Sequence, residues 1–163
     1  MQRRREIIGM KKDFNILYEA YNLSFNGTAS TVINTGIYLF TAENINRDFE
    51  LTAENIGGEN QANYTIICAK HNGNAYGFLV RTSNKTGTSY KGTVNIYPTP
   101  NNIVIKRING VITLSGTNIS NPTVQFINEV FNWPLVLGCA VDDEGNYFRY
   151  KTGTIGHILV RWL

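Results

Sequence analysis

Apolar and polar side chains alternate strictly from residue 47 to residue 54, which is the pattern of a half-buried β-strand. The two faces hold Phe49, Leu51 and Ala53 on one side and Asp48, Glu50, Thr52 and Glu54 on the other. The same period of two returns at 154–162, where Ile158, Val160 and Trp162 share a face. Both segments therefore predict strands that bury one face against a second layer.

Two Asn-Gly pairs, at 72–73 and 109–110, predict tight β-hairpins. The first pair joins strands expected at 64–69 and 76–81. Pairing outward from the second places Ile108 opposite Val111, Arg107 opposite Ile112, Ile105 opposite Leu114 and Ile103 opposite Gly116. One face of this hairpin then collects Ile103, Ile105, Ile112 and Leu114, while the other carries Lys106 and Thr113.

Further strands are expected at 16–25, 31–40, 135–141 and 147–150, and a short helix is expected at 124–131, ended by Trp133-Pro134. Asn is unusually common, with 21 residues, and it favours turns together with the 15 Gly. About ten or more short strands separated by turns predict an all-β, two-sheet antiparallel sandwich. We expect one domain over 14–163, preceded by an arm over 1–13.

The charge of the chain is concentrated in this arm. Residues 1–13 carry a net charge of +3, equal to that of the whole chain. The basic residues of the arm are Arg3, Arg4, Arg5, Lys11 and Lys12. The neutral body argues against a nucleic-acid-binding face on the fold. The arm is a candidate for docking on an acidic partner surface or on packaged nucleic acid; the alternative is a solvated terminus.

Neither a secretory signal nor a membrane span is predicted. The apolar run Ile7–Met10 is too short for a signal peptide, and no stretch approaches the roughly 20 apolar residues of a span. We therefore expect synthesis in the cytoplasm. In that compartment Cys68 and Cys139, each within an apolar run, are expected as buried thiols without a disulfide.

A series of short motifs resembles a known superfamily. The motifs are Ser24–Thr28, Val32–Ile37, Asp48–Leu51, Val104–Gly110, Pro134–Gly138, Gly145–Tyr150 and Gly153–Ile155. Their order and spacing over about residues 20–163 are similar to concanavalin A-like, laminin G-type jelly-roll domains. Among these, the chain most resembles the compact lectin-like domains of bacteriophage and prophage structural proteins, which commonly have a short basic start.

This resemblance implies a non-enzymatic virion protein, made in the host bacterial cytoplasm. We expect a capsid decoration or head-fibre component that is attached to capsid or fibre proteins through its arm. The alternative is a carbohydrate-binding or receptor-binding lectin module of a tail or fibre protein, which recognises a host cell-surface glycan. Proteins of this kind are often homo-oligomers, trimers among them.

A glycoside hydrolase is a third, weaker alternative, because the superfamily includes glucanases. Asp48, Glu50 and Glu54 share a strand face, as paired acid and base residues would. Their order, Asp-x-Glu-x-x-x-Glu, departs from the glucanase patterns Glu-x-Asp-x-Glu and Glu-x-Asp-x-x-Glu. The histidines, His71 and His157, lack zinc-ligand spacing, and no nucleophile elbow or phosphate loop is present.

Two kinds of ligand site remain as candidates. Related lectin folds often bind calcium through loop oxygens, and the acidic turn offers Asp142, Asp143 and Asn146 as hard ligands. The alternative for this turn is a solvent-facing loop, and no other cofactor is expected. Sugar binding would use aromatic faces at loop tips, for which the candidates are Tyr76, Tyr90, Tyr97, Trp133 and Tyr147. The alternative for these rings is packing in the core.

Overall fold

The computed structural model describes residues 13–58, 65–72, 75–82, 87–89, 93–96, 101–117 and 129–163. These residues form thirteen strands and one 3-10 helix, η1 (Ala29–Thr31). The described part of the chain contains no α-helix, so the prediction of an all-β protein is confirmed. It also contains no helix long and apolar enough to cross a membrane.

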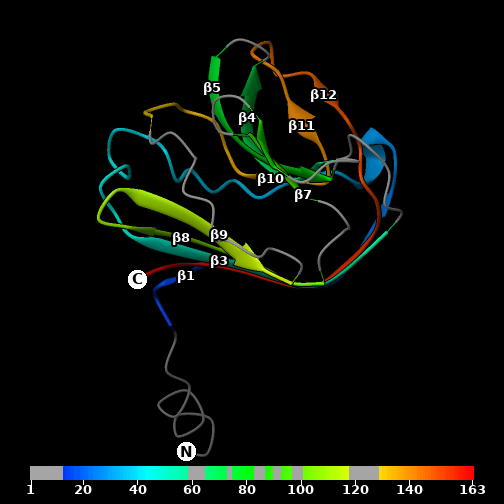
Figure 1. Cartoon of the computed structure of the whole chain (residues 1–163), viewed down its shortest axis with the longest axis horizontal. Coiled ribbons are helices and arrows are strands. Elements are labelled where there is room, and N and C mark those ends of the chain that lie inside the picture. The colour runs from blue at the N-terminus through cyan, green and yellow to red at the C-terminus, as the bar shows by residue number, and fades with distance from the viewer. Residues whose placement is uncertain are drawn as a thin grey trace, which may run out of the picture.

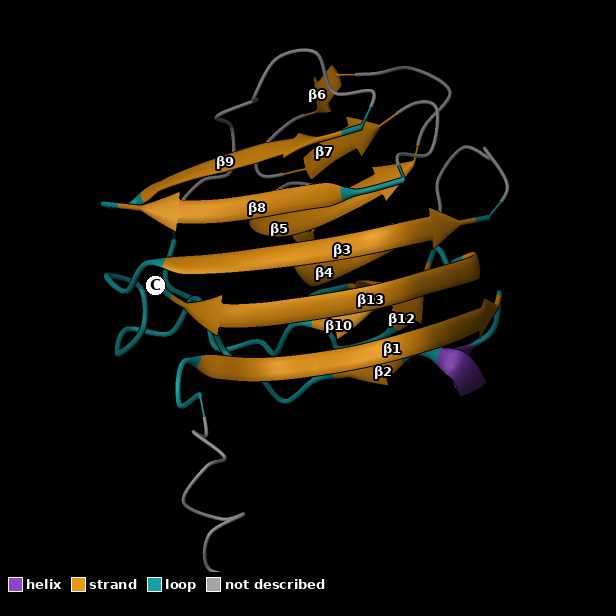
Figure 2. Ribbon diagram, turned by 90° about the horizontal axis from the view of Figure 1, so that it is seen from below, coloured by secondary structure: helices purple, strands orange, loops and turns teal. Residues whose placement is uncertain are grey.

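One layer is a five-stranded antiparallel sheet (Figure 2). Its order is β1 (Ile16–Asn26), β13 (Thr152–Trp162), β3 (Phe49–Gly57), β8 (Ile103–Ile108) and β9 (Val111–Gly116). The N-terminal strand and the C-terminal strand are therefore neighbours, and β1 forms one edge.

The second layer is a six-stranded sheet. Its order is β2 (Ile33–Asn34), β10 (Val136–Leu137), β4 (Thr65–Asn72), β5 (Ala75–Thr82), β7 (Thr93–Ile96) and β6 (Gly87–Ser89). One pair, β5–β7, is parallel, which corrects the expectation of purely antiparallel sheets. The chain passes from β5 to the outermost strand β6 and returns as β7 between them. Because β7 is antiparallel to β6, this return leaves it parallel to β5.

The core lies between the two sheets, which Figure 1 shows as stacked layers. Fully buried side chains from both sheets fill it, among them Leu51, Ile105, Val160, Ile67 and Phe78. A second apolar cluster lies on the other side of the six-stranded sheet, where β11 (Ala140–Val141) and β12 (Tyr147–Phe148) form a small hairpin. Cys68, Leu79 and Val136 pack in this cluster. The six-stranded sheet is thus partly covered on both faces.

Several local predictions are confirmed. The register of the β8–β9 hairpin is the one expected, and Ile103, Ile105, Ile112 and Leu114 are all buried. The expected faces of β3 and β13 are also buried.

Other predictions are wrong in extent. Of 31–40, only β2 is a strand, and 135–141 is divided into β10 and β11. The division falls at Gly138, whose φ of 87° interrupts extended backbone. The expected helix at 124–131 lies largely outside the described residues, and 129–131 is not helical.

A kink crosses three neighbouring strands of the five-stranded sheet at one level. Asn22 on β1 and Asn55 on β3 flank Gly156 on β13, and both asparagines have positive φ, 53° and 52°. The buried positions on β3 are consequently spaced by two up to Ala53 and then by three to Ile56. Since each strand gains one residue at the same level, the register is retained and the inner face stays apolar.

Both cysteines are buried thiols, as expected. Desolvation by burial raises the pKa of Cys139 to about 12 and raises that of Cys68 further. Since the thiolate is the reactive form, we expect negligible reaction of either thiol with a disulfide reagent in native buffer and rapid reaction of both in denaturant. The measurement is the absorbance of the released thiol. Rapid stoichiometric labelling of the native protein would contradict this burial.

Candidate functional site

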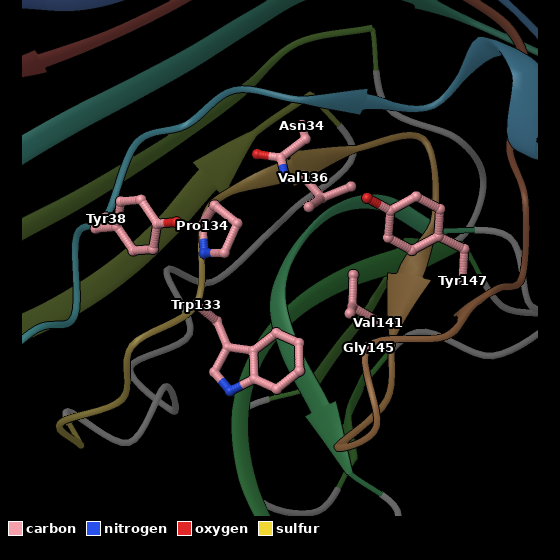
Figure 3. Close-up of a pocket in the computed structure, with 8 residues that line it drawn as sticks. All are labelled: Asn34, Tyr38, Trp133, Pro134, Val136, Val141, Gly145 and Tyr147. Atoms are coloured by element: carbon pink, nitrogen blue, oxygen red, sulfur yellow. The ribbon is translucent and has the colours of Figure 1, made fainter.

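An open cleft of about 240 Å³ lies beside the small β11–β12 hairpin (Figure 3). It is lined by Asn34, Tyr38, Trp133, Pro134, Val136, Val141, Gly145 and Tyr147. None of these side chains is charged, and three are aromatic. Ligand pockets for drug-sized molecules usually have about 300–1,000 Å³, so this cleft suits one small ring.

Strand pairing fixes the two walls of the cleft. One wall is β2 against β10, where Asn34 is paired with Val136. The other is β11 against β12, where Val141 is paired with Tyr147. Val136 and Val141 are buried in the apolar cluster beneath the hairpin, so the floor is rigid and apolar.

Three polar groups remain available in the cleft. The Oδ1 atom of Asn34 accepts the backbone N–H of Gly36 at 2.9 Å, which leaves its amide N–H₂ as a donor. The side-chain hydroxyls of Tyr38 and Tyr147 make no hydrogen bond to any described residue. Figure 3 shows these hydroxyls directed toward the middle of the cleft from opposite sides. A ligand with hydroxyl groups finds donors and acceptors on both walls.

The indole of Trp133 is half-buried against the second apolar cluster, and Gly145 lies beside it. A Cβ atom on Gly145 would lie 3.8 Å from the Cζ3 and Cη2 atoms of the indole, and this glycine has a φ of 84°. A larger side chain at this position would be strained and would lie on the ring. Gly145 therefore holds the turn close to Trp133 without covering it.

The acidic turn beside the cleft is stabilised by its own hydrogen bonds. The Oδ1 atom of Asp142 accepts the backbone N–H groups of Glu144 (2.9 Å) and Asn146 (2.8 Å), and Oδ2 accepts the side-chain amide of Asn146 (3.1 Å). The backbone N–H of Asn146, followed by its side chain, lowers the pKa of Asp142. Asp142 thus acts as the cap of this turn.

A calcium ion at Asp142, Asp143 and Asn146 would compete with these hydrogen bonds for the carboxylate of Asp142. In the described part of the chain, no group of three or more His, Cys, Asp or Glu side chains is arranged to hold a metal ion. The calcium site stays a prediction from the resemblance, without geometric support.

Two of the five predicted sugar-binding aromatics, Trp133 and Tyr147, meet in the cleft. Tyr76 lies on β5, but its side chain is not among those described. Tyr90 and Tyr97 fall outside the described residues. The basic residues of the arm, Arg3, Arg4, Arg5, Lys11 and Lys12, also fall outside them.

Of the carboxylates considered for hydrolysis, Glu50 and Glu54 lie on β3 and Asp48 directly precedes it, away from the residues that line the cleft. Asp48 accepts the backbone N–H of Asn109 at 2.8 Å and so fixes the β8–β9 turn. Glu50 contacts Lys106 (2.9 Å) and Arg161 (2.8 Å). The hydrogen bond from Lys106, then that from Arg161, lowers the pKa of Glu50. This is the opposite of the raised pKa that a general acid needs.

Sequence reasoning missed Tyr38 and Asn34. Both were assigned to a strand over 31–40, and the chain leaves the sheet after Asn34. The signal that could have shown the turn is the Asn34-Thr35-Gly36 triplet, in which the Asn side chain bonds the backbone two residues on.

The comparisons with known proteins identify no relative. No family model, no curated protein and no solved structure matches this chain.

Proposed function

We propose that this protein is a non-enzymatic β-sandwich binding module whose ligand is a small saccharide unit held in the Trp133 cleft. The observation that carries the proposal is the composition of this cleft. Three aromatic side chains from separate segments line it beside Asn34, and the two tyrosine hydroxyls and the Asn34 amide N–H₂ have no hydrogen-bond partner among the described residues.

The chemistry of a sugar ring fits these walls. A pyranose has an apolar C–H face and a rim of hydroxyl groups, so it stacks on an aromatic ring and hydrogen-bonds at its edge. Trp133 supplies a ring, and Tyr38, Tyr147 and the amide of Asn34 supply the edge contacts. A volume of about 240 Å³ accommodates one sugar residue of a longer glycan.

The arrangement of carboxylates favours binding over hydrolysis. Glycosidases place two carboxyl groups on either side of the bond that they cleave. The cleft has none in its lining, and Glu50 is held by two cations on the other sheet. We therefore propose recognition of the ligand without turnover.

Replacing Trp133 by alanine should weaken saccharide binding at least tenfold. Burial of a stacked aromatic surface is worth about 1.5–3 kcal/mol, which is tenfold or more in the dissociation constant. A glycan array would identify the ligand, and calorimetry would measure the loss. Tyr38→Phe, which removes only a hydroxyl, should give a smaller loss without affecting the fold.

The matched control is Tyr21→Ala, which removes an exposed aromatic ring from the five-stranded sheet. It should leave saccharide affinity unchanged. If the array shows no saccharide binding, or if Tyr21→Ala and Trp133→Ala weaken it equally, the cleft is not a saccharide site.

A second candidate function is attachment to a virion. The observation that favours it is the concentration of the whole net charge in residues 1–13, together with the resemblance to phage structural domains. In this proposal the sandwich is the exposed body of a capsid decoration or fibre component, and the arm binds capsid or fibre proteins. The two functions are compatible, because a receptor-binding module also needs an anchor.

Deletion of Met1–Lys12 should leave the fold intact and abolish incorporation into particles. The circular dichroism of the truncated protein should match that of the full chain, because β1 begins only at Ile16. Incorporation is measured by mass spectrometry of purified particles. Normal incorporation of the truncated protein would show that the arm is not the anchor.

A further inference from the structure

The outer face of the five-stranded sheet carries an acidic aromatic platform, made of Glu19 and Tyr21 on β1, His157 on β13 and Glu54 on β3. Figure 2 looks onto this face, and no other described element lies across it. The outer face of the six-stranded sheet, by contrast, is partly covered by the β11–β12 hairpin. The platform is therefore a surface feature with room for a partner.

The geometry of the platform is fixed by short contacts. The Nε2 atom of His157 lies 2.9 Å from Oε1 of Glu19, and Nδ1 lies 3.5 Å from Oε2 of Glu54. The ring of Tyr21 stacks on the imidazole with centroids 4.4 Å apart and planes at 14°. The hydroxyl of Tyr21 also donates to Oε1 of Glu19 at 2.7 Å. One face of Tyr21 covers His157, and 63% of this tyrosine is exposed.

The two carboxylates of the platform are paired with His157 and with no Lys or Arg of the described chain. Among the described residues, neither Glu19 nor Glu54 has a Lys or Arg within 4 Å. Glu50, on the same face, has both Lys106 and Arg161. The hydrogen bonds from Tyr21 and then His157 lower the pKa of Glu19, so this carboxylate is ionised at neutral pH.

An exposed tyrosine face flanked by two carboxylates fits a guanidinium group. Arginine stacks on aromatic rings and donates to carboxylates with the same planar fork. The chain itself contains a matching segment, because Arg3, Arg4 and Arg5 are consecutive in an arm of net charge +3. The charges of the platform and of the arm are complementary.

We propose that the platform binds the arginine-rich N-terminal segment of a second copy of this chain. Arg3 to Arg5 stand eight to ten residues before Asp13, a reach of up to roughly 25–35 Å when extended. That reach is long enough for the segment to lie on the sheet face of an adjacent copy. This inference is independent of the saccharide cleft, which lies beside the other sheet.

The experiment is sedimentation velocity on the full chain at increasing concentration, at about 0.02 M and about 0.5 M salt. We expect self-association that weakens at high salt. The double variant Glu19→Gln/Glu54→Gln should raise the dissociation constant of self-association about tenfold or more. The triple variant in which Arg3, Arg4 and Arg5 are replaced by Gln should raise it by a similar factor. Combining them should add little, because they remove the same contact. Glu144→Gln, an exposed glutamate beside the other sheet, is the matched control.

A second measurement identifies the site directly. The peptide of residues 1–12 is titrated into the full chain whose Arg3, Arg4 and Arg5 are glutamine, and the ring resonances of Tyr21 and His157 are followed. Saturable shifts that disappear in Glu19→Gln/Glu54→Gln support the proposal. A chain that stays monomeric at all concentrations, additive losses in the combined variant, or a peptide that leaves both rings unchanged would overturn it.

Discussion

Replacing Arg107 by methionine is expected to lower the free energy of unfolding by about 3–5 kcal/mol. Arg107 is fully buried and lies on the inner face of β8, beside Ile103 and Ile105. Its Nε donates to the carbonyl of Arg47 at 2.9 Å, and one terminal nitrogen donates to the carbonyls of Leu39 (2.8 Å) and Asn44 (2.9 Å). The guanidinium thus ties the irregular segment 39–47 to the five-stranded sheet.

The size of this effect follows from what methionine leaves behind. Methionine fills much of the volume but donates no hydrogen bond, so the carbonyls of Leu39 and Arg47 lose this donor at about 1–3 kcal/mol each, while the carbonyl of Asn44 keeps only the N–H of Arg47. The guanidinium also lies over the rings of Phe49 (4.9 Å) and Phe40 (5.4 Å). Burial lowers the pKa of Arg107 to about 10, which leaves it charged at neutral pH.

Urea unfolding measures the loss, and hydrogen exchange localises it. The amides of Asn44, Ile45 and Arg47, bonded within this segment, should lose protection first. The matched control is Arg161→Met, because that guanidinium is part-exposed and bonds only the side chain of Glu50 among the described residues. It should cost less than about 1 kcal/mol. Equal costs for the two variants would mean that Arg107 does not organise this segment.

Much of the sandwich could be predicted because its signals are local. An Asn-Gly pair fixes the register of a hairpin by itself, and alternation fixes which face is buried. The pairing of Arg107 with Ile112 was thereby predicted correctly. The burial of Arg107 was not, because its acceptors lie between 60 and 68 residues away in the chain. No local pattern indicates that a distant loop will close over a cation.

The kink at Asn22, Gly156 and Asn55 is a second feature that could not be predicted from the sequence. Asparagine was interpreted as a turn former, which holds for Asn109 with its φ of 48°. Asn22 and Asn55 use the same tolerance of positive φ inside strands. Each strand alone shows only an interrupted alternation. The three interruptions coincide because the strands pair, which is a tertiary property.

The sequence could indicate the kind of residue that lines the cleft, but not which of these residues come together. Trp133 and Tyr147 were candidates because exposed aromatics near turns suit sugars, whereas Tyr38 belonged to an expected strand. Tyr38 lies about 100 residues before Trp133 and Tyr147 in the chain, and the pairing of β2 with β10 brings them together. Composition indicates that aromatic rings are available, and only the sheet order shows which of them meet.

The second large effect concerns Lys151, which directly precedes β13 and has a fully buried side chain. Its Nζ donates to the carbonyls of Gly57 (2.6 Å) and Thr152 (2.7 Å). Burial lowers its pKa from 10.5 to about 8. Between these two values the unfolded chain binds a proton that the folded chain has released, so folding becomes more favourable as the pH rises.

We therefore expect Lys151 to contribute a rise of about 3 kcal/mol in the free energy of unfolding from pH 8 to about pH 10.5, at 1.4 kcal/mol per pKa unit. Lys151→Met should lack this rise, so the difference in stability between the native chain and this variant should grow with pH. Tyrosines and the other lysines titrate in both proteins and cancel in the difference. At a single pH, the change in the free energy of unfolding in Lys151→Met combines two effects: a buried charge is removed, and the carbonyls of Gly57 and Thr152 lose a donor. Only the pH dependence separates these effects. A difference that stays constant across this range would show that Lys151 keeps its proton in the folded chain.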